Sequence, residues 1–467
     1  MLYYGLVCTA ISDERQQLKE GMRQLAAFAH KHNIPITWAI VADDVQFHAK
    51  ELTQWHNEFG DDFLLMLDVK TLWDSQWRKL NGISEEEIDE QDQTSIQTHI
   101  ASPEILAEHL VRMRETLPGH IRTQWKKVQR YLEWASPSVV GAEWKNQILV
   151  HAIEQEGFRG LWGYRWNERD TLAEDDRGCP FGLFYPSNEQ HNFCAPTSGN
   201  ITAIPYDTLS HLDPDATNLR TALINDKLTE YYNLYLKNEK WNSWLAYIQH
   251  INAIEVSQLG QESLDRLDTY FANVTINEST RVYPLSEMVD DYWSSCQQTE
   301  PTFLIVDTPE YDTPEEVEDS ESTIPEANNS DEPKVKRTLL FYDSECQFAF
   351  YNGMMEPMEM KNYITPPVVE NTELGYSIDG TSLHGVEYHL PKVIGFSPIR
   401  KRSRLHLSFT IESTKVMPYG IAIWGNHQGL ELASSNAKSV TWIDEYLLFV
   451  RLALKNGQND YEIVLTI

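Results

Sequence analysis

Short apolar runs alternate with amphipathic stretches between residues 3 and 293. The run "YYGLVCTAI" (3–11) is rich in strand-forming residues, and apolar residues recur at helical spacing from Leu18 to Ala29. Further elements are expected as strands at 34–41, 63–69, 138–144, 159–166 and 200–207 and as helices at 45–59 and 146–157. Strands that alternate with helices in this way predict βαβ units and a parallel sheet. Six or more units in about 300 residues favour a (β/α) barrel over an open doubly wound sheet.

Two long helices are expected farther along the chain, over 216–237 and 240–256. The second is predicted from a stripe of apolar residues between Trp241 and Ile248, which recur at helical spacing. A final strand followed by a helix is expected at 281–293. We therefore assign the barrel to residues 1–306.

The chain changes character after residue 306. Residues 307–333 hold eleven acidic residues, no basic residues and four prolines. Such a segment stays extended because its charges repel one another, so we expect an inter-domain linker at 307–335. From 336 to 467, short strands separated by Gly, Asn, Asp and Pro replace the helical pattern. This pattern predicts an all-β sandwich.

The formal net charge of −32 disfavours two classes of partner. A surface of this sign repels nucleic-acid phosphates and anionic lipids, whereas uncharged glycans are compatible with it. No apolar run is long enough to span a membrane, so membrane insertion is not expected. No secretory signal pattern is present, which predicts a cytoplasmic protein, or a secreted or periplasmic one if a leader was removed. The five cysteines include no C-x-x-C pair, so neither a disulfide framework nor a zinc knuckle is expected.

One long loop combines aromatic and charged residues at the place where a barrel carries its active site. Functional groups of a parallel barrel lie at the carboxyl ends of the strands, and residues 167–187 follow the strand expected at 159–166. Aromatic rings can stack on the C–H faces of sugars, while charged side chains bond the sugar hydroxyl groups. The residues expected to bind a sugar are Trp144, Trp162, Tyr164, Arg165, Trp166 and Arg177. The alternative is that the charged residues only hold the loop in place.

Acidic residues also fall at or after the ends of expected strands. Two carboxyl groups that face each other across a sugar can hydrolyse a glycosidic bond, because one protonates the leaving oxygen and the other acts as base or nucleophile. The catalytic candidates are Glu143, Glu168, Asp68 and Asp176. Other acids at similar positions are Asp13, Asp43, Asp44 and Asp207. Any one of these acids can instead be a helix cap.

Three segments of the chain form a recognisable set. They are "FAHKHNIPITWAIVADDV" (28–45), "WHNEFGDDFLLMLDV" (55–69) and "RVYPLSEMVDDYW" (281–293). Together they resemble the polysaccharide deacetylase (NodB-like) superfamily. The segments "GLWGY" (160–164) and "DRGCPFGLFYPS" (176–187) resemble members of that superfamily with an added β domain. The resemblance implies a distorted (β/α) barrel that acts on carbohydrate.

The metal ligands of this family are replaced in the chain. Family deacetylases hold a divalent metal with an Asp from the first strand and two His four residues apart after the third. Here Met66 and Lys70 occupy the two His positions, and "TAISD" (9–13) leaves Asp13 as the candidate acid. A thioether and an ammonium group cannot replace two imidazoles. We therefore expect no metal or other cofactor, unless the metal site is rearranged.

The leading hypothesis is a metal-independent glycoside hydrolase that acts on an oligosaccharide or a polysaccharide. One alternative is a non-catalytic glycan-binding protein on a degenerate deacetylase barrel. The other is a metal-dependent carbohydrate deacetylase with a rearranged site. A carboxylate pair roughly 5 to 9.5 Å apart across the barrel mouth would favour hydrolysis over binding alone. The sequence does not indicate an oligomeric state.

Overall fold

The computed structural model describes the chain in several ranges, and all structural statements below concern these residues. They are residues 2–81, 103–142, 147–164, 182–183, 185, 201–208, 218–242, 244–295, 302–309, 335–343, 348–352, 369–371, 374–379, 391–414 and 416–466.

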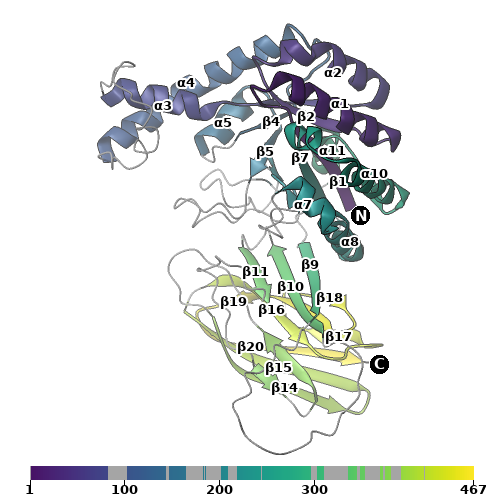
Figure 1. Cartoon of the computed structure of the whole chain (residues 1–467). Coiled ribbons are helices and arrows are strands. Elements are labelled where there is room, and N and C mark those ends of the chain that lie inside the picture. Colours follow the sequence, from purple (N-terminus) through teal and green to yellow (C-terminus); the bar gives the residue numbers. More distant parts are fainter. Residues whose placement is uncertain are drawn as a thin grey trace, which may run out of the picture. The chain divides into compact units, whose positions relative to one another are not determined.

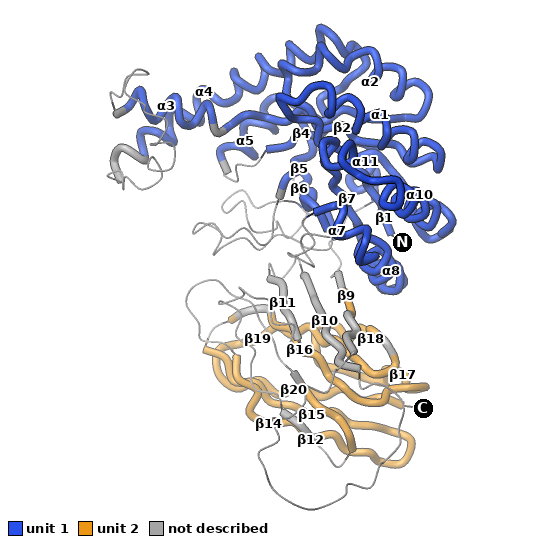
Figure 2. Tube along the Cα trace, viewed as in Figure 1, with its two compact units in different colours: residues 1–302, 343–347 blue, residues 303–342, 348–467 orange. Residues whose placement is uncertain are grey.

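The chain divides into two compact units, which Figure 2 colours blue and orange. The first comprises residues 1–302 and 343–347, and the second comprises residues 303–342 and 348–467. The barrel end expected at residue 306 falls inside the strand β9 (Thr302–Pro309).

A parallel sheet forms the centre of the first unit (Figure 1). Its described strands are β1 (Leu2–Thr9), β2 (Ile36–Val41), β3 (Asp62–Met66), β4 (Val139–Gly141), β5 (Gly160–Tyr164), β6 (Thr202–Pro205), β7 (Leu245–Asn252) and β8 (Thr280–Val282). The main path runs β6-β5-β4-β3-β2-β1-β7 with parallel pairing, and β8 pairs with the first residues of β1. This arrangement confirms the expected barrel-like parallel sheet, in an incompletely closed form.

Helices connect the strands and cover the sheet (Figure 1). They are α1 (Arg15–Lys31), α2 (Val45–Phe59), α3 (Val69–Asn81), α4 (Pro103–Gln129), α5 (Gln147–Gln155), α7 (Leu219–Ile224), α8 (Lys227–Asn238), α9 (Ala253–Ser257), α10 (Gln261–Ile276) and α11 (Leu285–Ser295). In the described ranges, no helix combines the length and the apolar character that crossing a bilayer requires.

The helix α11 packs on the inner face of the sheet, near the starts of the strands. Its buried residues Leu285, Met288, Val289 and Tyr292 share one apolar core with side chains from β1, β2, β3, β4 and β7. The Leu285 N–H donates to Thr37 Oγ1 at 2.9 Å, which ties the start of α11 to β2. Because this helix occupies the part of the face near the strand starts, a pocket can form only toward the strand ends.

A buried network around Asp61 fixes the starts of β2 and β3. The Asp61 carboxylate accepts hydrogen bonds from His30 Nε2 at 2.9 Å, from Trp38 Nε1 at 2.6 Å and from the Ile36 N–H at 3.0 Å. A buried carboxylate is costly unless such donors surround it, and Asp61 is only 1% exposed. This network lies at the amino ends of the strands, so we assign it to stability.

The prediction of one helix over 240–256 is wrong. The chain forms a 3₁₀ turn (Glu239–Trp241), then β7 and then α9. β7 pairs with β1 along its whole length, and side chains on both of its faces are buried. A strand buried on both faces need not alternate apolar and polar residues, so its pattern can also match a helical stripe. Asn252 ends β7 and caps α9 by accepting a bond from the Ile254 N–H at 2.9 Å.

The second unit contains the expected β-sandwich. One antiparallel sheet consists of β12 (Val369–Asn371), β13 (Tyr376–Asp379), β16 (Met417–Trp424), β19 (Leu447–Leu454) and β18 (Ser439–Asp444), in that order. The other consists of β14 (Lys392–Lys401), β15 (Arg404–Ser413), β20 (Gly457–Thr466) and β17 (Glu431–Ser435), in that order. Both sheets contribute to one core, for example through Ile421 and Val450 from the first and Leu407 and Ile463 from the second.

A further three-stranded sheet has the order β11-β10-β9. Its other members are β10 (Val335–Asp343) and β11 (Phe348–Asn352). The acidic stretch expected as a linker at 307–335 is therefore flanked by β9 and β10, which are neighbours in one sheet. Residues 310–334 of that stretch lie outside the described residues.

One histidine of the sandwich is buried without a hydrogen-bond partner on either ring nitrogen among the described residues. His427 is 1% exposed, and its ring packs edge-on against Tyr376 and Trp442 at centroid distances of 5.2 and 5.6 Å. Burial lowers the pKa of His427 from 6.5 to about 4, because an imidazolium would lose its solvation there. The folded protein therefore keeps this ring neutral at pH values where the unfolded chain protonates it.

We expect the second unit to lose stability as the pH falls from 6.5 toward about 4, because only the unfolded chain readily protonates His427 in this range. The difference is roughly 2 kcal/mol of unfolding free energy between about pH 7 and pH 5. Denaturant unfolding of His427→Leu should show a pH dependence that is smaller by this amount. The control His406→Leu, which removes an outer-face ion pair with Glu462, should retain it. Equal pH dependence in wild type and His427→Leu would contradict the prediction.

Candidate functional site

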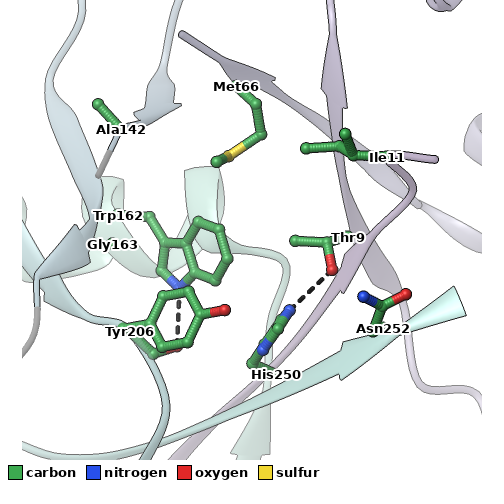
Figure 3. Close-up of a pocket in the computed structure, with 9 residues that line it drawn as sticks. All are labelled: Thr9, Ile11, Met66, Ala142, Trp162, Gly163, Tyr206, His250 and Asn252. Atoms are coloured by element: carbon green, nitrogen blue, oxygen red, sulfur yellow. Dashed lines mark hydrogen bonds between the residues drawn. The ribbon is translucent and has the colours of Figure 1, made fainter. Parts of the chain in front are cut away.

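A pocket lies at the carboxyl ends of the strands in the first unit, where parallel barrels carry their functional groups. Its lining residues, drawn in Figure 3, are Thr9, Ile11, Met66, Ala142, Trp162, Gly163, Tyr206, His250 and Asn252. They belong to the ends of β1, β3, β5 and β7 or directly follow β1, β4 and β6. The cavity volume of about 240 Å³ is below the roughly 300–1,000 Å³ of drug-sized ligand sites. It fits a small ligand or the end of a larger one.

Trp162 and Tyr206 form an aromatic wall of the pocket (Figure 3). Their rings stack with centroids 4.9 Å apart and planes 25° apart. Trp162 Nε1 donates to the Tyr206 carbonyl oxygen at 3.0 Å, so the pair is also fixed through the backbone. Trp162 is fully buried and Tyr206 is half-buried. Tyr206 is therefore the ring that a ligand can cover more extensively.

Polar groups line the side of the pocket formed by β1 and β7. His250 Nε2 and Thr9 Oγ1 are hydrogen-bonded at 2.8 Å, and Asn252 lies beside them at the end of β7 (Figure 3). The His250 ring also lies 4.7 Å from the Tyr206 ring. Apart from this imidazole, none of the nine lining side chains carries a charge near neutral pH. The lining thus offers hydroxyl, amide, imidazole and aromatic groups.

Two side chains that follow β6 bind the backbone of β7. Asp207 Oδ1 accepts a bond from the His250 N–H at 3.2 Å, and Thr208 Oγ1 accepts one from the Ile248 N–H at 3.0 Å. Both Asp207 and Thr208 are buried. Through these bonds, the segment after β6 is joined to the edge of β7 that β1 does not use. They also fix the backbone that carries His250 into the pocket.

The third side of the pocket is apolar and depends on two glycines. Ile11, Met66 and Ala142 form this side. A Cβ on Gly141 would collide with Met66 Sδ, so the absence of a side chain there lets Met66 take its place. Gly163 has a φ of +111°, and a Cβ on it would lie 2.6 Å from the Ala142 carbonyl oxygen. Both positions therefore require glycine.

The structure places three of the predicted site residues. Trp162 lines the pocket as expected of a substrate-binding residue. Asp68 is exposed just before α3, where its Oδ1 accepts a bond from the Thr71 N–H at 2.9 Å, and it is not part of the lining. Tyr164 ends β5, but its side chain is outside the description. The predicted residues wholly outside the described ranges are Glu143, Trp144, Arg165, Trp166, Glu168, Asp176 and Arg177. The carboxylate pair therefore stays a prediction.

The described residues do not fit the metal site of the deacetylase family. The candidate acid Asp13 is exposed and does not line the pocket. Met66, at the first expected His position, presents a thioether to the pocket instead of an imidazole. Within the described ranges, no three His, Cys, Asp or Glu side chains are grouped so that they could hold a metal ion.

Four polar or aromatic residues of the pocket do not belong to the predicted site. They are Thr9, Tyr206, His250 and Asn252. Thr9 and Tyr206 lie at the ends of strands that the sequence predicts, so their position at a strand end was an available signal. His250 and Asn252 fall in the segment predicted as a helix over 240–256. That error hides their position at the end of a central strand.

No family model and no curated protein matches this sequence. Three solved structures illustrate the similarity of fold. A Parabacteroides distasonis protein assigned as a glycoside hydrolase or deacetylase has 11% identity and a TM-score of 0.46, over 75% of this chain and 81% of its own. A Mycobacterium smegmatis protein assigned as a polysaccharide deacetylase has 9% identity and a TM-score of 0.40, over 64% and 93%. The 4-α-glucanotransferase from Thermococcus litoralis has 7% identity and a TM-score of 0.34, over 100% and 99%. Likenesses this distant concern the fold and carry no statement about activity.

We expect Gly163→Ala to destabilise the first unit, because the new Cβ would meet the Ala142 carbonyl oxygen and the φ of +111° disfavours a side chain. The expected loss is about 1–3 kcal/mol, measured as a lower midpoint of thermal unfolding. Gly119→Ala is the control, because Gly119 lies exposed in α4 with no atom within 4 Å of the new Cβ. That variant should be slightly more stable, since Ala favours a helix. Similar midpoints for both variants would show that Gly163 is not constrained.

Proposed function

We propose that this chain is a carbohydrate-active protein that binds a sugar residue of a neutral glycan in the pocket at the strand ends. The observation that carries the proposal is the lining, which combines the Trp162–Tyr206 wall with uncharged polar groups. An aromatic ring can cover the C–H face of a sugar. Hydroxyl, amide and imidazole groups can both donate hydrogen bonds to sugar hydroxyls and accept them. The sequence resemblance to polysaccharide deacetylases supports the same ligand class.

The reaction we propose is hydrolysis of a glycosidic bond by two carboxylates without a metal ion. The pair is drawn from Glu143, Glu168, Asp68 and Asp176. One carboxylic acid would protonate the leaving oxygen, and the other would act as base or nucleophile. Two observations support this set: Ala142 immediately precedes Glu143, and Gly163 lies on the strand that leads to Glu168, and both line the pocket. Without such a pair, the same pocket would serve a non-catalytic glycan-binding protein.

A second candidate function is the removal of an acyl group from a sugar, and His250 favours it. This is the side chain of the lining whose type titrates near neutral pH. Its hydrogen bond to Thr9 holds the ring at the pocket, and a positioned imidazole can transfer a proton to a leaving group. A metal-dependent form of this reaction requires a ligand set other than the family's, because Asp13 and Met66 do not supply it.

Tyr206→Leu should weaken the binding of neutral oligosaccharides about tenfold, a loss of roughly 1.4 kcal/mol, because it removes the accessible ring of the aromatic wall. Titration calorimetry with cello-, malto- and chito-oligosaccharides measures the effect. The matched control is Tyr283→Leu, which removes a tyrosine that packs against Tyr3 near the amino ends of the strands. That control should bind as wild type does. Equal losses in both variants would place the sugar elsewhere.

Mass spectrometry of native and acetylated oligosaccharides incubated with the chain, with and without a chelator, separates the candidate reactions. For glycoside hydrolysis we expect chain cleavage that survives the chelator. Alanine at either member of the catalytic pair should lower this cleavage by about 10²-fold or more. Full cleavage by all four variants, Asp68→Ala, Glu143→Ala, Glu168→Ala and Asp176→Ala, would refute the carboxylate assignment.

Other outcomes of that experiment favour the alternatives. Loss of acetyl groups that His250→Gln abolishes would favour acyl removal, and sensitivity of that loss to the chelator would indicate a rearranged metal site. Binding of an oligosaccharide without any change in its mass would favour a glycan-binding protein.

A further inference from the structure

A concentrated group of cations marks one end of the sandwich. It consists of Arg400, Lys401, Arg402 and Arg404, at the junction of β14 and β15, and is called the basic hairpin tip here. All four residues are exposed. None of them forms an ion pair with a described residue, in contrast to His406 on the same strand, which pairs with Glu462 at 3.0 Å. The four cations are therefore available to a partner.

The charge of this tip differs from that of its surroundings. Residues 336–467 contain twelve Lys and Arg and fourteen Asp and Glu, although the whole chain carries −32. The sandwich is thus almost neutral, and a third of its cations lie within residues 400–404. The repulsion that keeps anions from the acidic remainder of the chain is weak over this part of it.

The backbone holds the tip in a defined shape. β14 and β15 are antiparallel neighbours, and Lys401 pairs with Arg404, so Arg402 and Ser403 form a two-residue turn. Such turns use a positive φ at their first position, which favours Gly, Asn or Asp. Arg402 has a φ of +56° at this position. Arginine is a costly residue there, so the position carries a charge at the expense of backbone fit.

Protection of a sheet edge explains only part of this group. β14 is the edge strand of its sheet, and exposed cations, prolines and bulges commonly prevent edge strands from pairing with other chains. β14 already has Pro398 and a register shift between Val393 and Gly395. Arg404 lies on the neighbouring interior strand and Arg402 lies in the turn, where edge protection does not require a charge.

The groups around the tip leave it cationic. In register, Arg404 is paired with Thr466 of β20, and Thr466 is paired with Glu431 of β17, so the carboxylate in this row is one strand removed. On the inner side, Arg400 lies close enough to Tyr376 to act on its phenol, which is uncharged near neutral pH.

We propose that the basic hairpin tip binds an anionic polysaccharide, a polymer with carboxylate or sulfate groups along its chain. Arginine presents a planar set of donors that matches a carboxylate or sulfate in pairs, and three of the four cations are arginines. A polymer with repeated charges can contact several of these side chains at once. The choice of a polysaccharide over other polyanions rests on the proposed carbohydrate-directed function of the first unit. The sandwich would then hold a charged glycan while the pocket takes a neutral sugar residue.

Binding of the full chain to polygalacturonate, dextran sulfate and neutral dextran tests this proposal. We expect salt-sensitive binding to the two anionic polymers and none to dextran, because the contacts are ionic. Arg400→Gln/Arg404→Gln should weaken the binding at least tenfold. The control Lys392→Gln/Lys455→Gln removes the same charge from exposed residues of the same unit away from the tip, and it should bind as wild type does. Equal losses in the two double variants would overturn the proposal.

Arg402→Gly separates ligand binding from folding. Glycine fits the positive φ at this turn, so the variant should unfold at the same or a higher temperature and yet bind polygalacturonate more weakly. Unchanged affinity in this variant and in Arg400→Gln/Arg404→Gln would overturn the proposal even if wild type binds.

Two comparisons identify the polyanion class and keep this proposal separate from the function of the pocket. Tighter binding to a single-stranded DNA oligonucleotide or to phosphatidylserine vesicles than to polygalacturonate, lost in the same tip variants, would reject a polysaccharide as the partner. Tyr206→Leu should bind polygalacturonate normally, and the tip variants should bind neutral oligosaccharides normally. Failure at the pocket and failure at the tip are therefore distinguishable.

Discussion

The pocket depends on the bonds that join the segment after β6 to β7. The main path of the sheet ends at β6 on one side and at β7 on the other, and these strands do not pair among the described residues. The N–H groups of Ile248 and His250 would otherwise be buried without acceptors, each at a cost of about 1–3 kcal/mol. Asp207 and Thr208 supply the acceptors from their side chains. One set of bonds thus stabilises the open edge and holds His250 opposite the aromatic wall.

The sequence predicts the strands of this sheet well where turn residues and helices separate them. β1 to β6 follow the expected runs, and the later strand and helix are found at β8 and α11. β7 is the exception, because it is buried on both faces and lies between two short helical elements. Periodicity cannot distinguish such a strand from part of a buried helix. Pairing with β1 decides the outcome, and that long-range contact is not encoded in a local pattern.

This error explains most of what the predicted site lacks. In a helix over 240–256, His250 and Asn252 would have no reason to lie at the barrel mouth, whereas at the end of β7 they line the pocket. Acids at strand ends were ambiguous for a different reason. Asp207 and Asp68 both accept backbone N–H bonds in the structure, and a sequence alone cannot separate that role from catalysis. Trp162 was recognisable because it combines a strand-end position with an aromatic ring.

The acidic stretch leaves the sheet at β9 and returns to it at β10, so both of its ends are fixed next to each other in the same sheet. An insertion between neighbouring strands can change greatly in length while the strands remain paired, because the entropy of closing a loop grows only slowly with its length. Residues could therefore be added to this stretch or removed from it in related chains without lengthening the connection between the two units. That connection instead runs through the few residues before β9. Its length, rather than that of the acidic stretch, limits how far the two units can move apart at this crossing.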